Sequence, residues 1–397
     1  MSTSTVTEIT LPTAYRPGYP RAVVHDPDLA SLYVSNTLIS DPLGDAAVDS
    51  LGTCAPGTVH ALINAGMERD WDTLRKGPEP LQDFFGELET PPDWYRPGEY
   101  RAGIAAFHEN SDLFVPAFII ATLLNFSSLI SKAFCMTRRV TTKHGLRRIR
   151  QNTRHLLEVM LPGALERHGE GWRLSVRIRL VHAQVRRLIR DSGDWDETVY
   201  GVPLSAAHMG FASANFSATM LRYVNQLGAR LGAEERESFM QVWRYASWLS
   251  GTPDVLLFEG DEARTARLSL VAAACEPRPA LEPALISHAV IKAVPDVAEL
   301  KDPAARRAVV RHGYAISRAL LGREIANRLR FPRQPTLGLL AWLRCKRGIY
   351  RCLHRVAPDA ARRWRMDQFV LLLDASMIEG ITYHLPDQLD ALKATPW

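Results

Sequence analysis

One histidine, His182, stands at the edge of an apolar helix face in residues 171–190, whose sequence is GWRLSVRIRLVHAQVRRLIR. Apolar residues recur in this segment at steps of three and four, which places them on one side of an α-helix. They are Leu174, Ile178, Val181, Val185, Leu188 and Ile189. Arg179 lies about one turn before His182, and Arg186 lies about one turn after it. The sequence therefore predicts an imidazole between an apolar wall and two guanidinium groups.

An imidazole in this setting has two interpretations. It suits a ligand with an apolar body, a metal at its centre and anionic groups at its rim. Haem is such a ligand, because imidazole can bind the iron, apolar side chains can hold the porphyrin and arginines can pair with the propionates. A single histidine on a helix is, however, more often a packing residue with satisfied hydrogen bonds. The segment alone leaves both interpretations open.

The composition of the chain is that of a globular protein with a large core. Its 397 residues are 46% hydrophobic and 23% charged, enough for one large domain or two. The net charge of +5 is too small to indicate nucleic-acid binding by itself. The five cysteines form no C-x-x-C pair, so we expect reduced thiols rather than disulfides or a zinc site. The first residues contain neither an apolar signal segment nor a twin arginine, which predicts a cytoplasmic protein.

Helical patterns follow one another along the chain. Asp41 and Pro42 suit a helix cap and its first turn, and helices are expected at 57–71, 211–231 and 234–250. Residues 1–28 contain four prolines and are expected to form an irregular arm. Neither alternating strands nor a βαβ pattern occurs in the sequence. We therefore predict an all-α fold, a single-domain helical bundle, which would enclose a buried haem pocket if His182 binds haem.

Three regions of that bundle are expected to differ in their role. Residues 1–94 would supply the arm and packing helices, residues 95–290 the haem-binding core, and residues 291–397 further helices packed on the same domain.

Residues 113–131, LFVPAFIIATLLNFSSLIS, contain no charged side chain. That length raises the possibility of a membrane span. Asn125, Ser127 and Ser128 interrupt the apolar run, and no second such segment exists to pair with it. We therefore expect one buried core helix, which would form the far wall of a haem pocket.

Two segments are basic enough to raise the question of a charged partner. Residues 138–154 carry cations and no acid; the cations are Arg138, Arg139, Lys143, Arg147, Arg148, Arg150 and Arg154. They could bind phosphates, form a solvated face, or include one or two arginines that neutralise a bound anion. Stacking aromatics are not interleaved with them, which disfavours nucleic acid. Residues 336–356 combine leucines, tryptophan and cations, as an interfacial helix or a core-packing helix would.

A set of short blocks is spread over most of the chain. The blocks are the Asp41-Pro42 helix with DAAVDSL, then PLQDFF and PPDW, the uncharged segment 113–131, RRIRQNTRHLLEV, VRIRLVHAQVRR, VPLSAAHMGFASANFS and WRYASWLSGTPDVL. Their order and spacing resemble those of the bacterial latex-clearing proteins, or rubber oxygenases, and relatives that include the oxygenase of the mycophenolic acid pathway. The resemblance implies an all-helical fold and a b-type haem held by one proximal histidine, here His182.

The resemblance also implies residues near the haem. Family members have an arginine and, four positions later, a threonine. Here Arg148 keeps the arginine and Thr153 keeps the threonine one position further on, with Arg150 as the alternative cation. Arg148 and Thr153 are the expected catalytic residues. No lysine lies beside them, so the distal lysine of some relatives is not expected here.

Two other positions depart from the family pattern. Relatives usually carry an acidic residue where this chain has His208, which would be either a hydrogen-bond donor supporting the site or a packing residue. Rubber-cleaving members have a glutamate on the core helix that is thought to act as a base, and residues 113–131 contain none. Rubber-like cleavage is therefore less expected than haem binding.

These observations predict a haem b-dependent oxygenase that uses dioxygen and acts on an apolar, unsaturated or isoprenoid small molecule, by oxidative C=C cleavage or by oxygen insertion. His182 would bind the iron, and further haem contacts would come from Arg148, Arg150, Thr153, Arg179 and Arg186. The alternative is a non-enzymatic helical protein that docks on a membrane or nucleic acid through its basic helices. We expect no nucleic-acid partner, and peripheral membrane contact stays open. A terpene cyclase would need an aspartate-rich D-D-x-x-D run, which the sequence lacks.

Overall fold

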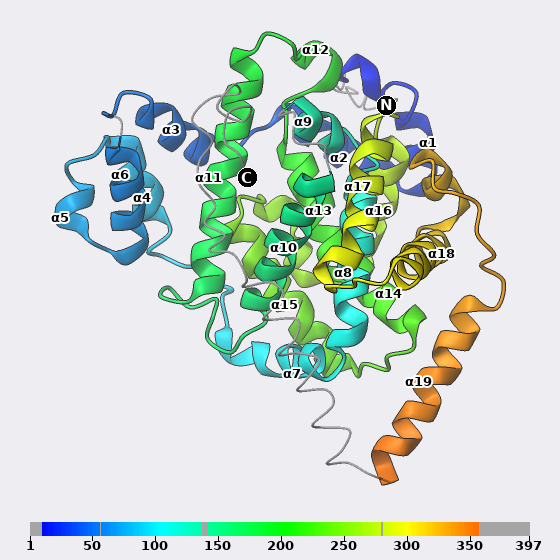
Figure 1. Cartoon of the computed structure of the whole chain (residues 1–397). Coiled ribbons are helices and arrows are strands. Elements are labelled where there is room, and N and C mark those ends of the chain that lie inside the picture. Colours follow the sequence, from blue (N-terminus) through cyan, green and yellow to red (C-terminus); the bar gives the residue numbers. More distant parts are fainter. Residues whose placement is uncertain (1–9, 56, 137–141, 279–280, 357–397) are drawn as a thin grey trace, which may run out of the picture.

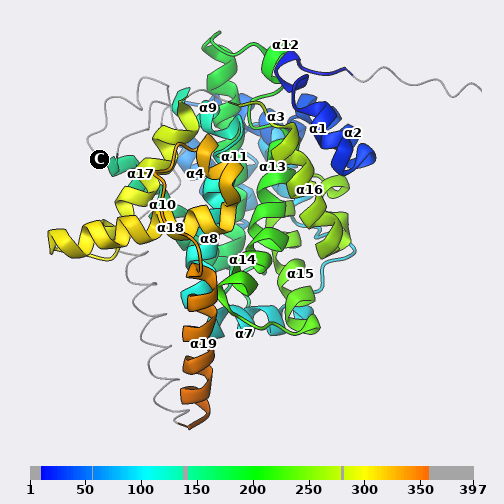
Figure 2. The same cartoon turned by 90° about the vertical axis from the view of Figure 1, so that its right-hand side faces the viewer.

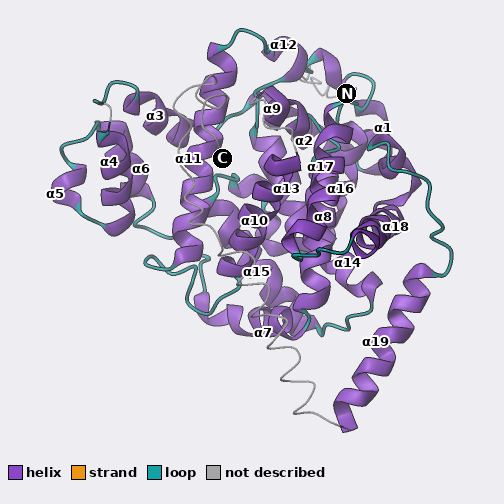
Figure 3. Cartoon of the chain, viewed as in Figure 1, coloured by secondary structure: helices purple, strands orange, loops and turns teal. Residues whose placement is uncertain are grey.

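The structure is a computed structural model that describes residues 10–55, 57–136, 142–278 and 281–356. Within these ranges the side chains of residues 142–149, 350 and 353–355 are outside the description. Helices and connecting loops make up all four ranges, and no strand occurs in them (Figure 3). The predicted all-α fold is confirmed.

The helices have the following bounds. They are α1 (Tyr19–His25), α2 (Pro27–Ser35), α3 (Pro42–Leu51), α4 (Thr58–Glu68), α5 (Trp71–Leu74), α6 (Glu79–Glu87), α7 (Arg101–Glu109), α8 (Ser111–Asn125), α9 (Ile130–Met136), α10 (Thr142–Val159), α11 (Glu170–Asp191), α12 (Glu197–Tyr200), α13 (Ala206–Ala214), α14 (Met220–Leu227), α15 (Ala233–Leu249), α16 (Glu262–Cys275), α17 (Glu282–Val297), α18 (Pro303–Arg328) and α19 (Leu339–Val356).

The central helices share one contiguous hydrophobic core, as expected for a single domain. Helix α10 packs against α17 and α11, and α15 packs against α7 and α11. Helices α3 to α6 lie on the far side of α11 from this centre, whereas α18 and α19 lie at the opposite edge of the molecule (Figure 1). The long helix α11 therefore lies between α3–α6 and the central helices, whereas α1 and α2 pack against α16.

The uncharged segment 113–131 is buried, as predicted, but it does not form one helix. Helix α8 ends at Asn125, and α9 begins at Ile130 after a bend of 82°. The Ser128 hydroxyl donates to the carbonyl of Asn125 at 2.6 Å and accepts from the Ile130 N–H at 3.2 Å. A polar side chain thus replaces the helical hydrogen bonds at the bend. Among the described residues, no single helix is long and apolar enough to cross a membrane.

The N-terminal region is more regular than expected. Residues 1–28 were expected to form an irregular arm, but α1 and α2 begin there, with Pro20 and Pro27 in their first turns. Proline is favourable at that position because its missing N–H has no helical partner there. Asp26 caps α2 with its side chain, and Asp41 caps α3 as predicted. The prolines therefore mark helix starts.

The helix expected at 211–231 is divided into three parts. A π-helical turn, Asn215–Thr219, lies between α13 and α14. Helix α14 ends at Leu227, before Gly228, whose φ of 113° is left-handed. The helix therefore ends before Gly228 rather than at residue 231, because glycine adopts this backbone conformation without steric cost.

Helix α19 lies at the periphery and extends away from the body (Figure 2). Leu340 and Leu343 pack against the core, whereas Trp342 and Ile349 are exposed. The core-packing interpretation of residues 336–356 thus holds for one face of the helix only.

Candidate functional site

His182 lies near the middle of α11 and has the properties of a metal-binding imidazole. The residue is half-buried, and its Nδ1 is buried without a hydrogen-bond partner. Burial, followed by the charge of Arg186, lowers the pKa of His182 to about 3. The ring is therefore neutral near pH 7, which is the form that binds a metal ion.

A packing histidine would have a different environment. A buried polar atom without a partner costs about 1–3 kcal/mol, and core histidines usually avoid that cost by hydrogen bonding. Among the described residues, no hydrogen bond is formed by either ring nitrogen of His182. The geometry favours the metal-binding interpretation of His182, which stays a prediction.

His155 on α10 is a neighbouring histidine with the opposite character. It is buried, and its Nε2 lies 2.9 Å from the hydroxyl of Ser175 on α11. Burial lowers the pKa of His155 to about 4, and this ring contributes to the lowered pKa of His182. His155 therefore joins α10 to α11 beside His182. Sequence reasoning missed it, although it follows Thr153 by only two residues.

The other predicted pocket residues of α10 are described in part. Thr153 is buried and Arg150 is half-buried. Arg148 belongs to α10, but its side chain lies outside the described residues. The roles of these three residues toward a haem stay predictions.

Aromatic side chains from three helical elements form an apolar wall next to His155. Trp243 on α15 meets the His155 ring edge to face, with 6.2 Å between the ring centroids. Phe216 in the π-helical turn lies 5.6 Å from Trp243, and Phe118 on α8 stacks on Phe216 at 4.6 Å. π-helical turns occur often at functional sites, because they change the direction of a side chain within a helix. This one places Phe216 between α8 and α15.

Arg179 and Arg186 contact the N-terminal helix α3 and its cap. Arg179 donates to both carboxylate oxygens of Asp41, at 2.6 and 2.7 Å. Arg186 is buried and donates to Asp45 at 2.7 Å and to the carbonyl of Leu204 at 3.1 Å. Burial alone would raise the pKa of Asp41, but the bonds and charge of Arg179, with the charge of Arg186, lower it. Both arginines thus anchor α3 to α11.

These contacts bear on the predicted role of the two arginines. Each guanidinium group already pairs with a carboxylate, so neither is an open cation for a haem propionate. Nη2 of Arg186 is buried and makes no hydrogen bond. The propionate role of Arg179 and Arg186 stays a prediction that the carboxylate pairs do not favour.

The residues around His182 fit a haem through their axial ligand. The imidazole is neutral and unpartnered, as an iron ligand must be, and apolar aromatic side chains lie next to the neighbouring His155. In the described part of the chain, no group of three or more His, Cys, Asp or Glu side chains could hold a metal ion.

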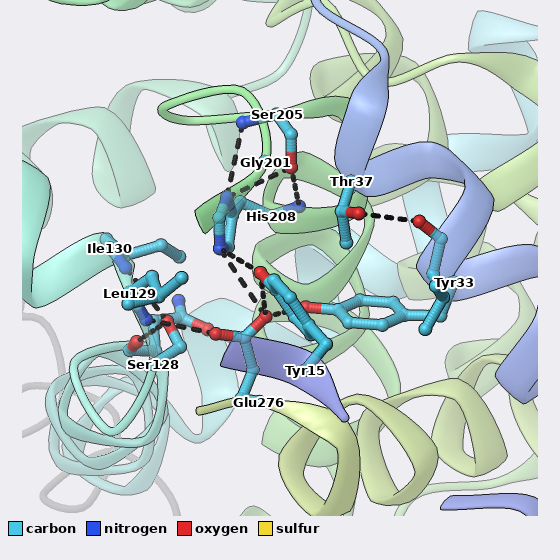
Figure 4. A network of polar contacts seen from close by, with 12 residues as sticks. Tyr15, Tyr33, Thr37, Ser128, Leu129, Ile130, Gly201, Ser205, His208 and Glu276 are labelled. Atoms are coloured by element: carbon cyan, nitrogen blue, oxygen red, sulfur yellow. Dashed lines mark hydrogen bonds and ion pairs between the residues drawn. The ribbon is translucent and has the colours of Figure 1, made fainter. Parts of the chain in front are cut away.

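A second polar cluster was not anticipated from the sequence: the carboxylate of Glu276 lies at the centre of a fully buried network (Figure 4). Tyr33 and Tyr15 donate their hydroxyl protons to its Oε1, at 2.5 and 3.1 Å. The N–H of Leu129, at the bend between α8 and α9, donates to Oε2 at 3.0 Å. The network thus joins α2 and the N-terminal segment to the bend and to the end of α16.

His208 is the fourth contact of Glu276, with 3.4 Å between the His208 Nε2 and the Glu276 Oε1. The backbone N–H of Ser205 donates to the His208 Nδ1 at 3.2 Å, so the ring proton lies on Nε2 and faces Glu276. Two roles were considered for His208, a hydrogen-bond donor and a packing residue. The structure shows features of both, because the ring is buried and also makes hydrogen bonds. No sequence signal identified Glu276 as the partner of His208, because the two residues lie 68 positions apart along the chain.

His155 and His182 predict how the stability of the protein depends on pH. The unfolded chain protonates its histidines near pH 6.5, whereas native His155 and His182 stay neutral down to about pH 4 and 3. The unfolded state therefore binds more protons in this window, and the free energy of unfolding falls as the pH is lowered from 6.5. Urea unfolding at about pH 5 and about pH 7.5 measures this slope.

The slope is proportional to the number of protons that the unfolded state binds in excess of the native state. The variant His182→Leu is expected to lower that number by up to one. The exposed His168→Leu is the matched control and is expected to leave the slope unchanged. An equal slope in wild type and His182→Leu would contradict the lowered pKa.

Comparison with known proteins identifies the family. The family model for the ER-bound oxygenase mpaB/B'/rubber oxygenase catalytic domain matches residues 106–357. A rubber oxygenase from Streptomyces sp. (strain K30) is 28% identical over 185 residues, which cover 44% of this chain and 42% of that protein. The closed-state structure of latex clearing protein matches with a TM-score of 0.61 and 18% identity over 90% of each chain, which shows the shared fold. The chain therefore belongs to the family of mpaB/B' and rubber oxygenases.

Proposed function

We propose that this protein is a haem b-dependent oxygenase that uses dioxygen to modify an apolar, unsaturated or isoprenoid small molecule. The observation that carries the proposal is the neutral His182 ring, which is unpartnered in a chain of an oxygenase family. The rubber oxygenase from Streptomyces supports an isoprenoid substrate by its name. The reaction would be oxidative cleavage of a C=C bond or insertion of oxygen.

The residues of this chain would divide the work as follows. His182 would hold the iron with a ring nitrogen, and its lowered pKa keeps protons from competing for that nitrogen. Arg148 or Arg150 would pair with the propionates, and the hydroxyl of Thr153 would offer a hydrogen bond inside the pocket. Phe118, Phe216 and Trp243 would exclude water and hold the apolar substrate. When bound, haem supplies the activation of dioxygen.

The test uses the full chain, purified after expression with haem supplied. We expect a Soret band in its visible spectrum. With a panel of isoprenoids that differ in length, we expect substrate-dependent oxygen uptake and incorporation of ¹⁸O from ¹⁸O₂ into products analysed by mass spectrometry. Labelled carbonyl groups on two fragments would indicate cleavage, whereas one labelled oxygen on an intact skeleton would indicate insertion. A colourless protein would contradict the haem, and a coloured protein that consumes no oxygen with any isoprenoid would contradict the substrate class.

A further inference from the structure

Helix α19 carries an apolar stripe that faces away from the protein body. Its members are Trp342, Cys345, Ile349, Cys352 and Val356. All five are exposed, with 54% of Trp342, 64% of Ile349 and 85% of Val356 accessible. Such a contiguous exposed apolar face is unusual on a folded domain and marks an interaction surface.

The opposite face of α19 attaches the helix to the body through arginines. Arg344 donates to the carbonyl of Gln226 at 2.9 Å, and Arg351 donates to the carbonyl of Gly228 at 2.6 Å. Arg347 is buried and pairs with Asp112 at 2.9 Å. The two carbonyls belong to the C-terminal end of α14, where cations are favoured by the helix dipole. Polar bonds therefore fix the orientation of α19 and keep its apolar stripe outward.

The spacing of the stripe indicates what binds to it. Its members follow one another at alternating steps of three and four residues, the a and d positions of a heptad repeat. This is the pattern of a helix that packs against another helix. The a positions are Trp342, Ile349 and Val356, of which the last two are β-branched, and β-branched residues at a favour two-stranded coiled coils. The d positions are Cys345 and Cys352.

The distribution of charge on α19 distinguishes between a helical partner and a lipid surface. An interfacial helix directs its cations toward lipid head groups beside its apolar face. Here three arginines are turned to the protein instead, and among the described side chains of α19 only Lys346, which lies 5.5 Å from the Trp342 ring, flanks the stripe as a cation. The stripe itself is uncharged, so two identical copies can meet without like-charge repulsion.

We propose that the outward stripe of α19 binds the same stripe of a second copy of this chain, forming a short parallel coiled coil. The contact pairs each a position and each d position with its own counterpart across a two-fold axis. The stripe covers about two heptads, and an interface of this size is at the small end of specific ones. We therefore expect a weak dimer whose population depends on the protein concentration. This proposal does not rest on the proposed function.

The first experiment is sedimentation velocity over a series of protein concentrations. A concentration-dependent shift from monomer to dimer is expected for the wild type, and Ile349→Asp is expected to weaken the dimer by about 100-fold, because it buries a charge at a central a position. The matched control, Val255→Asp, replaces another exposed apolar residue, 52% accessible, and is expected to dimerise like the wild type. A monomer at every concentration would overturn the proposal, as would a dimer that Ile349→Asp does not weaken.

The second experiment uses the cysteines as position markers. With a short bis-maleimide, Cys345→Ser and Cys352→Ser should each still form a cross-linked dimer, because the remaining d position faces its own counterpart. The double variant should form none, since Cys54 and Cys135 are half-buried and Cys275 is buried. Cross-linking in the double variant, or in neither single variant, would contradict the parallel pairing of α19. A monomer that binds vesicles of anionic lipid would instead favour the interfacial helix.

Discussion

His182→Ala is expected to lower the affinity for haem by more than about 100-fold. Removing a partner that merely orients a metal ligand already costs about 10–100-fold in affinity, so removing the ligand itself should cost more. The measurement is titration of the haem-free protein with haem, followed by the Soret absorbance. His168→Ala, at an exposed position, is the control and should bind like the wild type. Added imidazole should restore part of the Soret band in His182→Ala.

The stability of the haem-free His182→Leu variant distinguishes between the two interpretations of His182, a metal ligand and a packing residue. Nδ1 of His182 is buried without a partner, so replacing the ring by leucine removes an unsatisfied group. The haem-free His182→Leu protein should therefore unfold at the same urea concentration as the wild type or a higher one. If His182→Leu were strongly destabilised and His182→Ala still bound haem normally, His182 would be a packing residue and the haem site would lie elsewhere.

Glu276→Ala is expected to destabilise the protein by about 4 kcal/mol or more. Four donors would lose their acceptor: the Tyr15 and Tyr33 hydroxyls, the His208 Nε2–H and the Leu129 N–H. Each unsatisfied buried donor costs about 1–3 kcal/mol. Removing a buried charge is favourable in itself, and the direction of the Glu276 pKa decides which effect is larger.

Burial opposes the charge of Glu276, yet its contacts with His208, Tyr33 and Leu129 lower its pKa overall. The donors therefore outweigh desolvation, and their loss dominates. Urea unfolding measures the effect, and Tyr33→Phe, which removes one donor, should cost about 1–3 kcal/mol and keep the protein folded. The control Glu237→Gln lies at an exposed position and should change stability by less than about 0.5 kcal/mol. A Tyr33→Phe variant as stable as the wild type would contradict a stabilising role of the hydrogen bond from Tyr33 to Glu276.

The sequence predicted the parts of this protein that depend on local pattern. The apolar spacing of residues 171–190 predicted α11 within one residue at each end, and Asp41 with Pro42 predicted the start of α3. Caps and helix periodicity are properties of neighbouring residues, so a single sequence carries them. The bend after Asn125 was missed because the Leu129 N–H at the bend donates to Glu276, which lies at the end of α16, far away along the chain.

The candidate site was predictable in its central residue and less so in its surroundings. His182 stands out in sequence because it interrupts an apolar face. The charged partners of Arg179 and Arg186 are Asp41 and Asp45, more than 130 positions earlier, so the two arginines looked like open cations. Tyrosines such as Tyr33 have no pattern that marks them as donors to a buried carboxylate. Long-range pairing of polar groups is set by the tertiary fold.

The N-terminal contacts have a consequence for the size of the cooperative folding unit. The segment that matches the family model begins at residue 106, whereas Tyr15, Tyr33, Asp41 and Asp45 precede it. A fragment limited to that segment would retain Glu276 without its tyrosine donors, and Arg179 and Arg186 without the carboxylates that pair with them. Glu276 would keep only His208 and the Leu129 N–H as partners. The first helices therefore belong to the unit that must fold together, and this unit extends beyond the segment that matches the family model.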